Sequence, residues 1–443
     1  MRVDFFKGAI LALFIGFSGD LMAEDTDIQT LRAELLELRS DYESRIADLE
    51  RRLAIAEQNA MQASYGALPT AAASASGNAA FNPAIGVIFT GNAWNYSGDP
   101  EGYAVEGFPY GGEAGPISEG LGLGETEIIM NANVDDKFTA WLTAAIAVED
   151  GEAAIELEEA WVETTALPAG FGAKFGRFFS KIGYLNDKHT HTWDFADQPL
   201  PYQAFLAGQL VDDGLQLRWL APTDLYLELG GEALSGTNYP ASGRGNSGAG
   251  SYSLFANFGG DVGRNSSWLA GVSLLDAAAT ERLSGDEDNP LFFSGDSQLL
   301  TAQFVWKWAA DGNWRDRNFV LQAEIMRRSE DGLYEGIGLA PALYDVDQYG
   351  WYAQAVYQPV PRWRVGGRID ALSTDNPGPA FDGSLLEAPD SDPRRYSIMA
   401  DWANSEFSRL RLQYTRDDAG LAGDNQWGLQ YIHAIGAHGA HTF

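Results

Sequence analysis

Hydrophobic and polar residues alternate along most of the chain, most regularly from Lys137 to Val148. In this segment Phe138, Ala140, Leu142, Ala144, Ile146 and Val148 share one face of an extended strand, and Lys137, Thr139, Trp141, Thr143 and Ala145 share the other. Similar runs centre on residues 81–94, 121–134, 154–165, 170–180, 209–220, 224–234, 250–260, 266–276, 297–308, 318–328, 348–359, 363–372, 395–404, 407–416 and 424–435. Together these segments predict 16 β-strands, each near the length of a tilted strand that crosses a bilayer.

The connections between these strands alternate in length. Short connections follow the even-numbered strands, as at 135–136, 167–169, 221–223, 359–362 and 404–406. The connections after odd-numbered strands are mostly long, at 95–120, 181–208, 235–249, 277–296, 329–347 and 373–394. Membrane barrels place tight turns in the periplasm and long loops outside the cell, so the pattern predicts an all-β membrane barrel over residues 81–443.

The first 80 residues differ in pattern from the rest. Residues 1–23 have two early basic residues, a short apolar run and a small residue at Ala23, which predicts a signal peptide. Within residues 24–60, apolar positions follow a heptad spacing with one four-residue step, which predicts a short α-helical coiled coil that drives oligomerisation. A single amphipathic helix packed on a core is the alternative. Residues 61–80 are rich in Ala, Ser and Gly and read as a flexible linker.

Composition narrows the possible functions. The 443 residues contain no cysteine, so disulfide frameworks, thiolate metal sites and cysteine nucleophiles are excluded. The formal net charge of −33 argues against nucleic-acid binding. The same charge suits a lumen that favours cations, although much of it can simply keep long loops soluble. We find no Gly-x-Ser-x-Gly motif and no other nucleophile constellation, so we expect no enzyme.

Aromatic residues lie near the ends of the predicted strands, as in the girdles that anchor a barrel at the membrane interface. They include Trp306, Trp308, Trp351, Tyr357, Trp363, Tyr396, Trp402, Tyr414 and Trp427, and the chain ends in Phe443. With these features, the chain resembles the 16-stranded general and substrate-selective porins of Gram-negative outer membranes. The segment 175–179, Phe-Gly-Arg-Phe-Phe, is similar to the strand before the constriction loop of anion-selective porins.

The resemblance implies further properties. Porins of this kind are trimers held in outer-membrane lipid and lipopolysaccharide, and an insertion machinery assembles them using the terminal phenylalanine. The coiled coil is similar to that of certain trimeric porins, and we expect it in the periplasm. His438, Gly439 and His441 interrupt the apolar alternation before Phe443 and leave the end of the last strand open.

The connection 181–208 is the most informative loop, because it is less polar than an exposed loop should be. In the porins that the chain resembles, this loop folds into the barrel and narrows the pore. The resemblance therefore implies a pore constriction formed by Asp187, Lys188, His189, His191, Asp194 and Asp197. An extracellular lid or a trimer contact is the alternative for this loop.

His189 and His191 also have a spacing that could place both imidazoles on one ion such as Zn²⁺ or Cu²⁺. Hydrogen bonding along the pore is the alternative, and no other cofactor is expected.

Charged residues with polar-face parity predict the lining of the pore. Early strands carry Glu125, Glu127, Glu149 and Glu156, and late strands carry Arg364, Arg368, Arg395, Arg409 and Arg411. Acidic and basic walls facing each other would create a transverse field, whereas local cross-strand ion pairs would only stiffen the wall. At Glu158 and Glu159 the alternation slips, which suggests a β-bulge.

Three functions fit these observations. The first is a passive diffusion channel for small hydrophilic solutes, with cation or metal preference as a refinement. The second is an outer-membrane receptor for a metal or metal chelate, although such receptors have 22 strands and a plug. The third is a structural tether that joins the outer membrane to another envelope layer through the coiled coil.

Overall fold

A computed structural model describes residues 83–100, 102–111, 114–149, 152–241, 248–285 and 290–436. The predicted signal peptide (1–23), coiled coil (24–60) and linker (61–80) lie outside these residues, as do Phe81, His438, His441 and Phe443. Among the described residues, no helix has the length and apolar character needed to cross a membrane.

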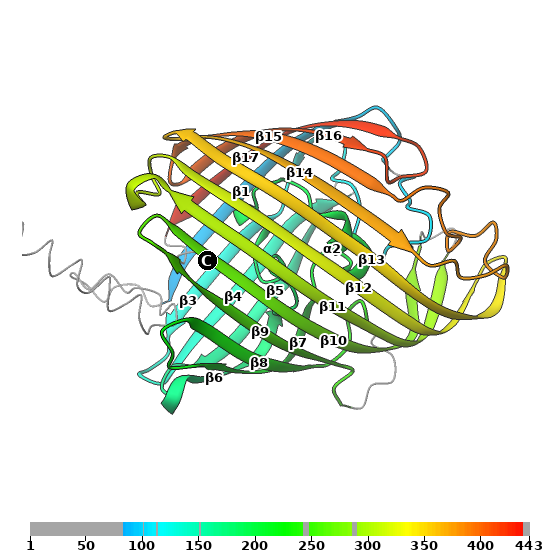
Figure 1. Ribbon diagram of the computed structural model, residues 1–443, viewed down its shortest axis with the longest axis horizontal. Coiled ribbons are helices and arrows are strands. Elements are labelled where there is room, and N and C mark those ends of the chain that lie inside the picture. Colours follow the sequence, from blue (N-terminus) through cyan, green and yellow to red (C-terminus); the bar gives the residue numbers. More distant parts are fainter. Residues whose placement is uncertain are drawn as a thin grey trace, which may run out of the picture. The chain divides into compact units, whose positions relative to one another are not determined.

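The described chain is built almost entirely of β-strands joined in one antiparallel sheet (Figure 1). The strands are β1 (Ala84–Tyr96), β2 (Gly120–Leu123), β3 (Thr126–Asn133), β4 (Phe138–Glu149), β5 (Glu152–Thr164), β6 (Phe171–Phe179), β7 (Val211–Leu220), β8 (Tyr226–Leu234), β9 (Ser251–Val262), β10 (Ser266–Ser284), β11 (Leu291–Ala309), β12 (Asn318–Gly336), β13 (Leu339–Val360), β14 (Trp363–Thr374), β15 (Arg394–Ser405), β16 (Ser408–Asp417) and β17 (Asp424–Gly436). One α-helix, α2 (Leu200–Leu206), and three 3₁₀ turns, η1 (Pro168–Gly170), η2 (Thr190–Thr192) and η3 (Ala310–Gly312), complete the described elements.

The sheet closes on itself, because β1 pairs with β17 on one side and with β2 and β3 on the other. The short β2 and the longer β3 pair with successive parts of β1, and only Gly124 and Glu125 separate them, so together they occupy one position in the wall. The barrel therefore has 16 antiparallel positions in sequence order, with β2 as one extra short strand. This confirms the predicted fold class and all 16 predicted strand segments.

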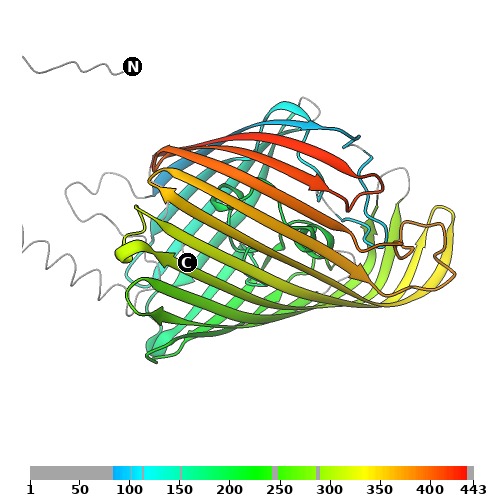
Figure 2. The same ribbon diagram turned by 45° about the horizontal axis from the view of Figure 1, so that its top comes forward.

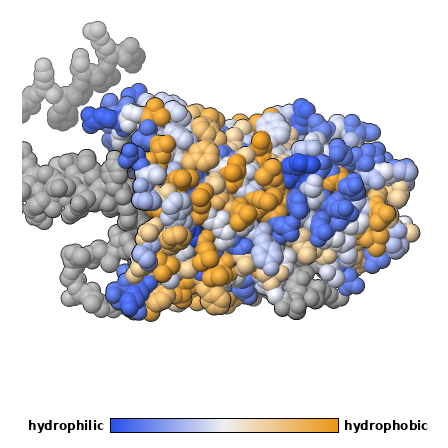
Figure 3. Space-filling view, turned by 60° about the horizontal axis from the view of Figure 1, so that its bottom comes forward, coloured by the Kyte–Doolittle hydropathy of each residue, from blue (hydrophilic) through white to orange (hydrophobic). Residues whose placement is uncertain are grey.

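The alternation of β4 has the predicted orientation. Phe138 and Val148 are exposed on the outside, whereas Thr143 and Ala145 are buried on the inside. The same parity places Trp351, Trp402 and other girdle aromatics on the exposed face. Figure 3 shows apolar residues gathered over the visible wall of the barrel, with more hydrophilic residues toward the end with the long hairpins. A lipid-facing surface of this kind is the expected exterior of an outer-membrane barrel.

Two of the predicted long loops are largely strand. The connection predicted at 277–296 shortens to residues 285–290, because β10 and β11 continue as a paired ribbon. The connection predicted at 329–347 shortens to a turn at residues 337–338 between β12 and β13. The Arg327–Asp347 ion pair joins β12 and β13 where these extensions begin. Phe293, Tyr334 and Tyr344 on the ribbons form a small apolar core with residues of the 375–393 connection.

Candidate functional site

A long segment between β6 and β7 enters the barrel. We call residues 180–210 the inner loop. Its α2 helix lies within the ring of strands in both ribbon views (Figures 1 and 2). Every residue of α2 is buried, and Tyr202, Phe205 and Leu206 share one apolar cluster with wall residues such as Leu275 and Leu299. Apolar burial of this size, at about 1.5–3 kcal/mol for a fully buried large side chain, explains why so apolar a loop is stable inside a barrel.

The neck of the inner loop is closed by hydrogen bonds. The side chain of Asn186 donates to the carbonyl oxygens of Ser180 and Leu210, both at 2.8 Å, and accepts from the backbone N–H of Leu210 at 2.7 Å. Glu232 of β8 accepts from the Ser180 hydroxyl at 2.5 Å and from the Lys181 N–H at 2.9 Å. These bonds hold the two ends of the loop together where it leaves the wall.

Glu324 of β12 holds the loop on a second side of the barrel. Its carboxylate accepts from the backbone N–H of Tyr184 at 2.8 Å and from the Tyr202 hydroxyl at 3.0 Å. The hydroxyl of Tyr352, on the neighbouring strand β13, donates to the same carboxylate. A buried carboxylate needs such donors, because an unpaired one would cost several kcal/mol.

The histidines of the inner loop meet an acidic part of the wall. His191 Nδ1 lies 2.7 Å from Glu127 Oε1, and His189 Nε2 lies 2.8 Å from Glu159 Oε2. His189 Nδ1 lies 3.2 Å from Glu127 Oε2 and 3.7 Å from Glu158 Oε2. Glu158 belongs to the predicted β-bulge, which is confirmed because Thr143 pairs with Glu159 and Ala144 with Leu157. The bulge brings two successive glutamates toward the loop.

The aspartates of the inner loop meet a basic part of the wall on β14, β15 and β16. Asp194 Oδ1 accepts from Arg364 Nη1 at 2.7 Å. Asp197 Oδ2 accepts from Arg368 Nη2 at 2.8 Å and from Arg395 Nη1 at 3.3 Å. Burial raises the pKa of Asp197, but the two guanidinium groups lower it by more than burial raises it. The pKa of Asp197 therefore lies below its ordinary value. Asp197 therefore stays ionised at neutral pH.

Two more arginines bind the backbone of the loop. Arg409 Nη2 donates to the carbonyl oxygen of His191, and Arg411 Nη2 donates to that of Trp193, both at 2.6 Å. All five predicted lining arginines therefore contact the inner loop.

Several of these arginines also form the cross-strand ion pairs that were the alternative interpretation. Arg395 Nε lies 2.9 Å from Asp417 Oδ2, and Arg411 Nε lies 3.0 Å from Asp401 Oδ1. The arginines thus stiffen the wall and bind the loop at the same time.

The remaining predicted residues, with the exception of Glu125, lie apart from these contacts. Asp187 pairs with Lys188 and with Lys181, at 3.4 Å in both cases, and these lysines lower the pKa of Asp187 to about 2 despite its burial. Glu125 lies between β2 and β3, in electrostatic contact with His189 of the inner loop. Glu149 ends β4, and Glu156 of β5 is exposed beside Ala145 on the neighbouring strand. The predicted set therefore divides into wall anchors of the inner loop and residues outside that contact.

The sequence analysis did not identify all of the anchors. Glu232 and Glu324 carry the neck and the second side of the loop, and both share the inward parity of their strands. That parity was a usable signal, because each is an acid on the face opposite the apolar one. Glu158 and Glu159 were left without a face, because the bulge breaks the parity of β5.

No protein-family model matches the chain. An uncharacterized protein of Aquifex aeolicus (strain VF5) is 32% identical over 353 residues, which cover 75% of this chain and 72% of that protein.

Solved outer-membrane proteins are similar at lower identity. The outer membrane channel DcaP of Acinetobacter baumannii has a TM-score of 0.49 at 13% identity, covering 79% of this chain and 96% of that one. OprB of Pseudomonas putida has a TM-score of 0.48 at 11% identity, covering 79% and 94%. An anion-selective porin of Comamonas acidovorans has a TM-score of 0.48 at 10% identity, covering 79% and 98%. The strand pairing of this chain establishes its barrel architecture independently of these similarities.

Proposed function

The chain belongs to the same family as the Aquifex aeolicus protein, and we propose that it is an outer-membrane porin through which small hydrophilic solutes diffuse passively. The observation that supports this proposal is a closed barrel with an apolar exterior and a polar interior, across which one loop is held by charged contacts. In this proposal the inner loop limits the width of the passage, because it occupies space that the wall alone would leave to water.

We further propose that the passage prefers cations. Around the inner loop, each guanidinium of Arg364, Arg395 and Arg411 already lies beside a wall carboxylate, so little positive charge is left uncompensated. On the acidic side, Glu125, Glu127, Glu158 and Glu159 outnumber the two histidines. Carboxyl oxygens grouped at a narrow point attract cations and repel anions.

Planar lipid bilayers test both parts of the proposal. The purified mature protein should produce discrete conductance steps, and in a KCl gradient the reversal potential should have the sign of a cation-preferring pore. Glu159→Gln should reduce that preference, whereas Glu406→Gln at the exposed turn between β15 and β16 should not. Failure to conduct in any preparation with a folded barrel would overturn the channel function. A reversal potential of the opposite sign would overturn the cation preference alone.

The assembly that we propose is a homotrimer in outer-membrane lipid and lipopolysaccharide, with the coiled coil in the periplasm. The resemblance to trimeric porins and the heptad pattern of residues 24–60 support it. The mass of the mature protein in detergent, measured by light scattering with the detergent subtracted, should be three times that of the chain. A chain-sized mass would contradict the trimer and leave the channel proposal untouched.

The two alternative functions have less support. Energy-coupled receptors close 22 strands around a plug, whereas the described part of this chain closes 16 positions around one of its own loops. A tether would need a partner for the coiled coil, which lies outside the described residues.

A further inference from the structure

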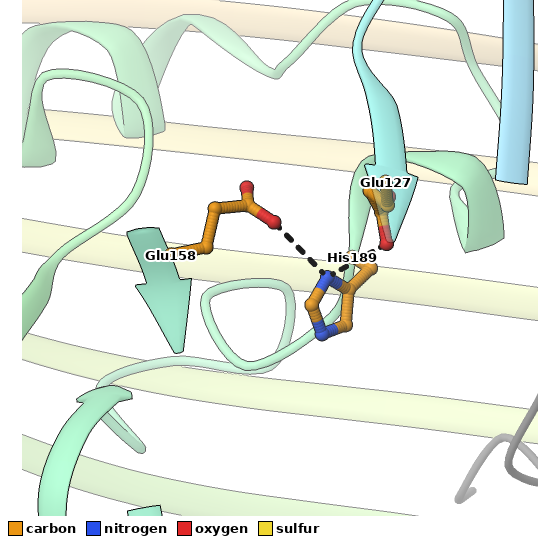
Figure 4. Close-up of side chains that lie close together, drawn as sticks. All are labelled: Glu127, Glu158 and His189. Carbon is orange, nitrogen blue, oxygen red and sulfur yellow. Dashed lines mark ion pairs between the residues drawn. The ribbon is translucent and has the colours of Figure 1, made fainter. Parts of the chain in front are cut away.

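Four glutamates gather where the inner loop touches β3 and β5. Glu127 comes from β3, Glu158 and Glu159 come from the β5 bulge, and Glu125 precedes β3 in electrostatic contact with Glu127 and Glu158. Figure 4 shows His189 of the loop pointing its Nδ1 atom toward the carboxylates of Glu127 and Glu158. With His191 on the other oxygen of Glu127, two imidazoles face four carboxylates, so the acids are in excess.

Several polar atoms in this cluster are buried without a hydrogen bond. They are Glu125 Oε1, Glu127 Oε2, Glu158 Oε2 and His189 Nδ1. The Glu127 side chain is completely buried, and its Oε2 atom points into the cluster, where it makes no hydrogen bond and its contact with His189 Nδ1 is 3.2 Å long. A buried carboxylate oxygen without a donor is costly, and a bound ion is one of the few arrangements that removes the cost.

The distances suit a metal ion. Ligand atoms bound tetrahedrally to Zn²⁺ at about 2.0–2.2 Å lie roughly 3.3–3.6 Å from one another. The two distances from His189 Nδ1 are 3.2 Å to Glu127 Oε2 and 3.7 Å to Glu158 Oε2, and all three ligand atoms lie within 4.8 Å of one another. One imidazole with two carboxylates is also a donor set that Zn²⁺ accepts in proteins.

We propose that Glu127, Glu158 and His189 bind a divalent transition-metal ion, for which Zn²⁺ is the best match. The ion would cross-link the inner loop to two strands of the wall and would compensate the excess of carboxylates. His191 is a positioning residue in this arrangement, because its Nδ1 atom holds Glu127 Oε1 and so turns Oε2 toward the ion. The role of the ion as a clamp on the loop rests on the proposed channel function, but binding itself does not.

A binding measurement tests the site without relying on conduction. The mature protein is purified without a polyhistidine tag, stripped with EDTA and titrated with ZnCl₂ in a calorimeter, and bound zinc is counted by mass spectrometry. We expect one Zn²⁺ per chain in the cluster, with a Kd that rises at least about tenfold in Glu158→Gln and in His189→Gln. His433→Gln is the matched control, because His433 has the outward parity of Tyr431 on β17, whereas the cluster faces the inside of the barrel. The Kd of this variant should be unchanged.

Heat-modifiable migration on a gel shows whether each variant keeps its folded barrel. If Glu158→Gln fails to fold, Glu158→Asp replaces it, since the shorter carboxylate withdraws the ligand atom without removing the charge. X-ray absorption at the zinc edge should show only nitrogen and oxygen ligands at about 2.0–2.2 Å. Zinc binding that is equal in the wild type, Glu158→Gln and His189→Gln, or absent from the wild type, would overturn the site and show His189 to be only an ion-pair partner. Loss of conduction with retained zinc binding would instead overturn the channel.

Discussion

Replacing Asp197 with asparagine should loosen the inner loop at its basic wall contact. Asp197 accepts from Arg368 at 2.8 Å, from Arg395 at 3.3 Å and from Gln413 at 2.5 Å. Asparagine keeps the shape but loses the charge, and its NH₂ group would face either the guanidinium groups or the Gln413 amide, which both donate toward residue 197. The substitution therefore removes the strongest part of this contact while leaving the packing of the loop intact.

The size of the effect follows from what the arginines retain. Breaking a buried ion pair costs about 3–5 kcal/mol when the partner is left without compensation. Here Arg368 keeps Asp370 at 3.1 Å and Arg395 keeps Asp417 at 2.9 Å, so neither arginine is left alone. We therefore expect Asp197→Asn to weaken the attachment of the inner loop by about 2–3 kcal/mol, which corresponds to the loss of the short charged hydrogen bond from Arg368 and the longer one from Arg395. At 1.4 kcal/mol per factor of ten, this raises the population of the detached loop by about 30- to 150-fold.

Cysteine labelling measures this population directly, because the natural chain has no cysteine. Ala204 on α2 is fully buried, so a thiol introduced there by Ala204→Cys should react only when the loop leaves its place. When detachment is faster than labelling, the labelling rate follows the detached population. Asp197→Asn should therefore raise the rate by the factor given above.

Asp213→Asn is the matched control for this substitution. The Asp213 side chain is 67% exposed and lies 3.7 Å from Arg177, so the labelling rate should stay within about twofold of that of the parent. Equal rates in Asp197→Asn and Asp213→Asn would refute the idea that the basic wall holds the loop.

Three further predictions concern the same contacts and the barrel wall. Since the pKa of Asp197 is lowered, its stabilising contact is present above the ordinary carboxyl pKa and is lost as the pH falls through the lowered pKa. In single-channel records, steps to a higher conductance caused by detachment of the inner loop should therefore become frequent only below about pH 4. If these steps already become more frequent at about pH 5, another group is responsible for the pH sensitivity. Gly176→Ala should destabilise the barrel by about 1–3 kcal/mol or more, because Gly176 has φ 129° and an added Cβ would lie 2.2 Å from the Ala160 carbonyl oxygen. The temperature at which the barrel unfolds, measured by its migration on a gel, should fall. Gly115→Ala should leave this temperature unchanged, because there is open space around Gly115. Leu412→Arg on the outward face should cost about 2–4 kcal/mol in urea titrations of folding into vesicles. Glu406→Arg at the exposed turn between β15 and β16 is the control, and equal stabilities of the two variants would contradict the orientation of β16.

The barrel wall could be predicted from the sequence because its pattern is local. Every strand alternates, so the period of two located all 16 strand segments and even the slip at the β5 bulge. The ends of β10 to β13 were wrong for a physical reason. The predicted segments have the length of a tilted strand that crosses a bilayer, whereas these ribbons continue to pair beyond that length, and backbone hydrogen bonding determines their ends.

The candidate site was predictable only in its parts. Parity placed the arginines on the inside, and the residue types of the inner loop suggested charged and histidine contacts. Which wall residue each loop residue meets depends on a non-periodic backbone path, and such a path leaves no spacing signal in one sequence. For the same reason the contact between Glu324 and Tyr202 was missed, because it joins positions far apart in the chain.

Replacing residues 184–208 by a short Gly/Ser linker and recording single-channel conductance tests most directly whether the inner loop sets the passage through this barrel. A linker of this kind removes α2 and the contacts of Asp194 and Asp197, while the strands and their register stay as they are. The predicted result is a folded barrel whose unit conductance is several times that of the parent, with weaker ion preference. A folded barrel with the same unit conductance and the same ion preference as the parent would contradict the role of the inner loop.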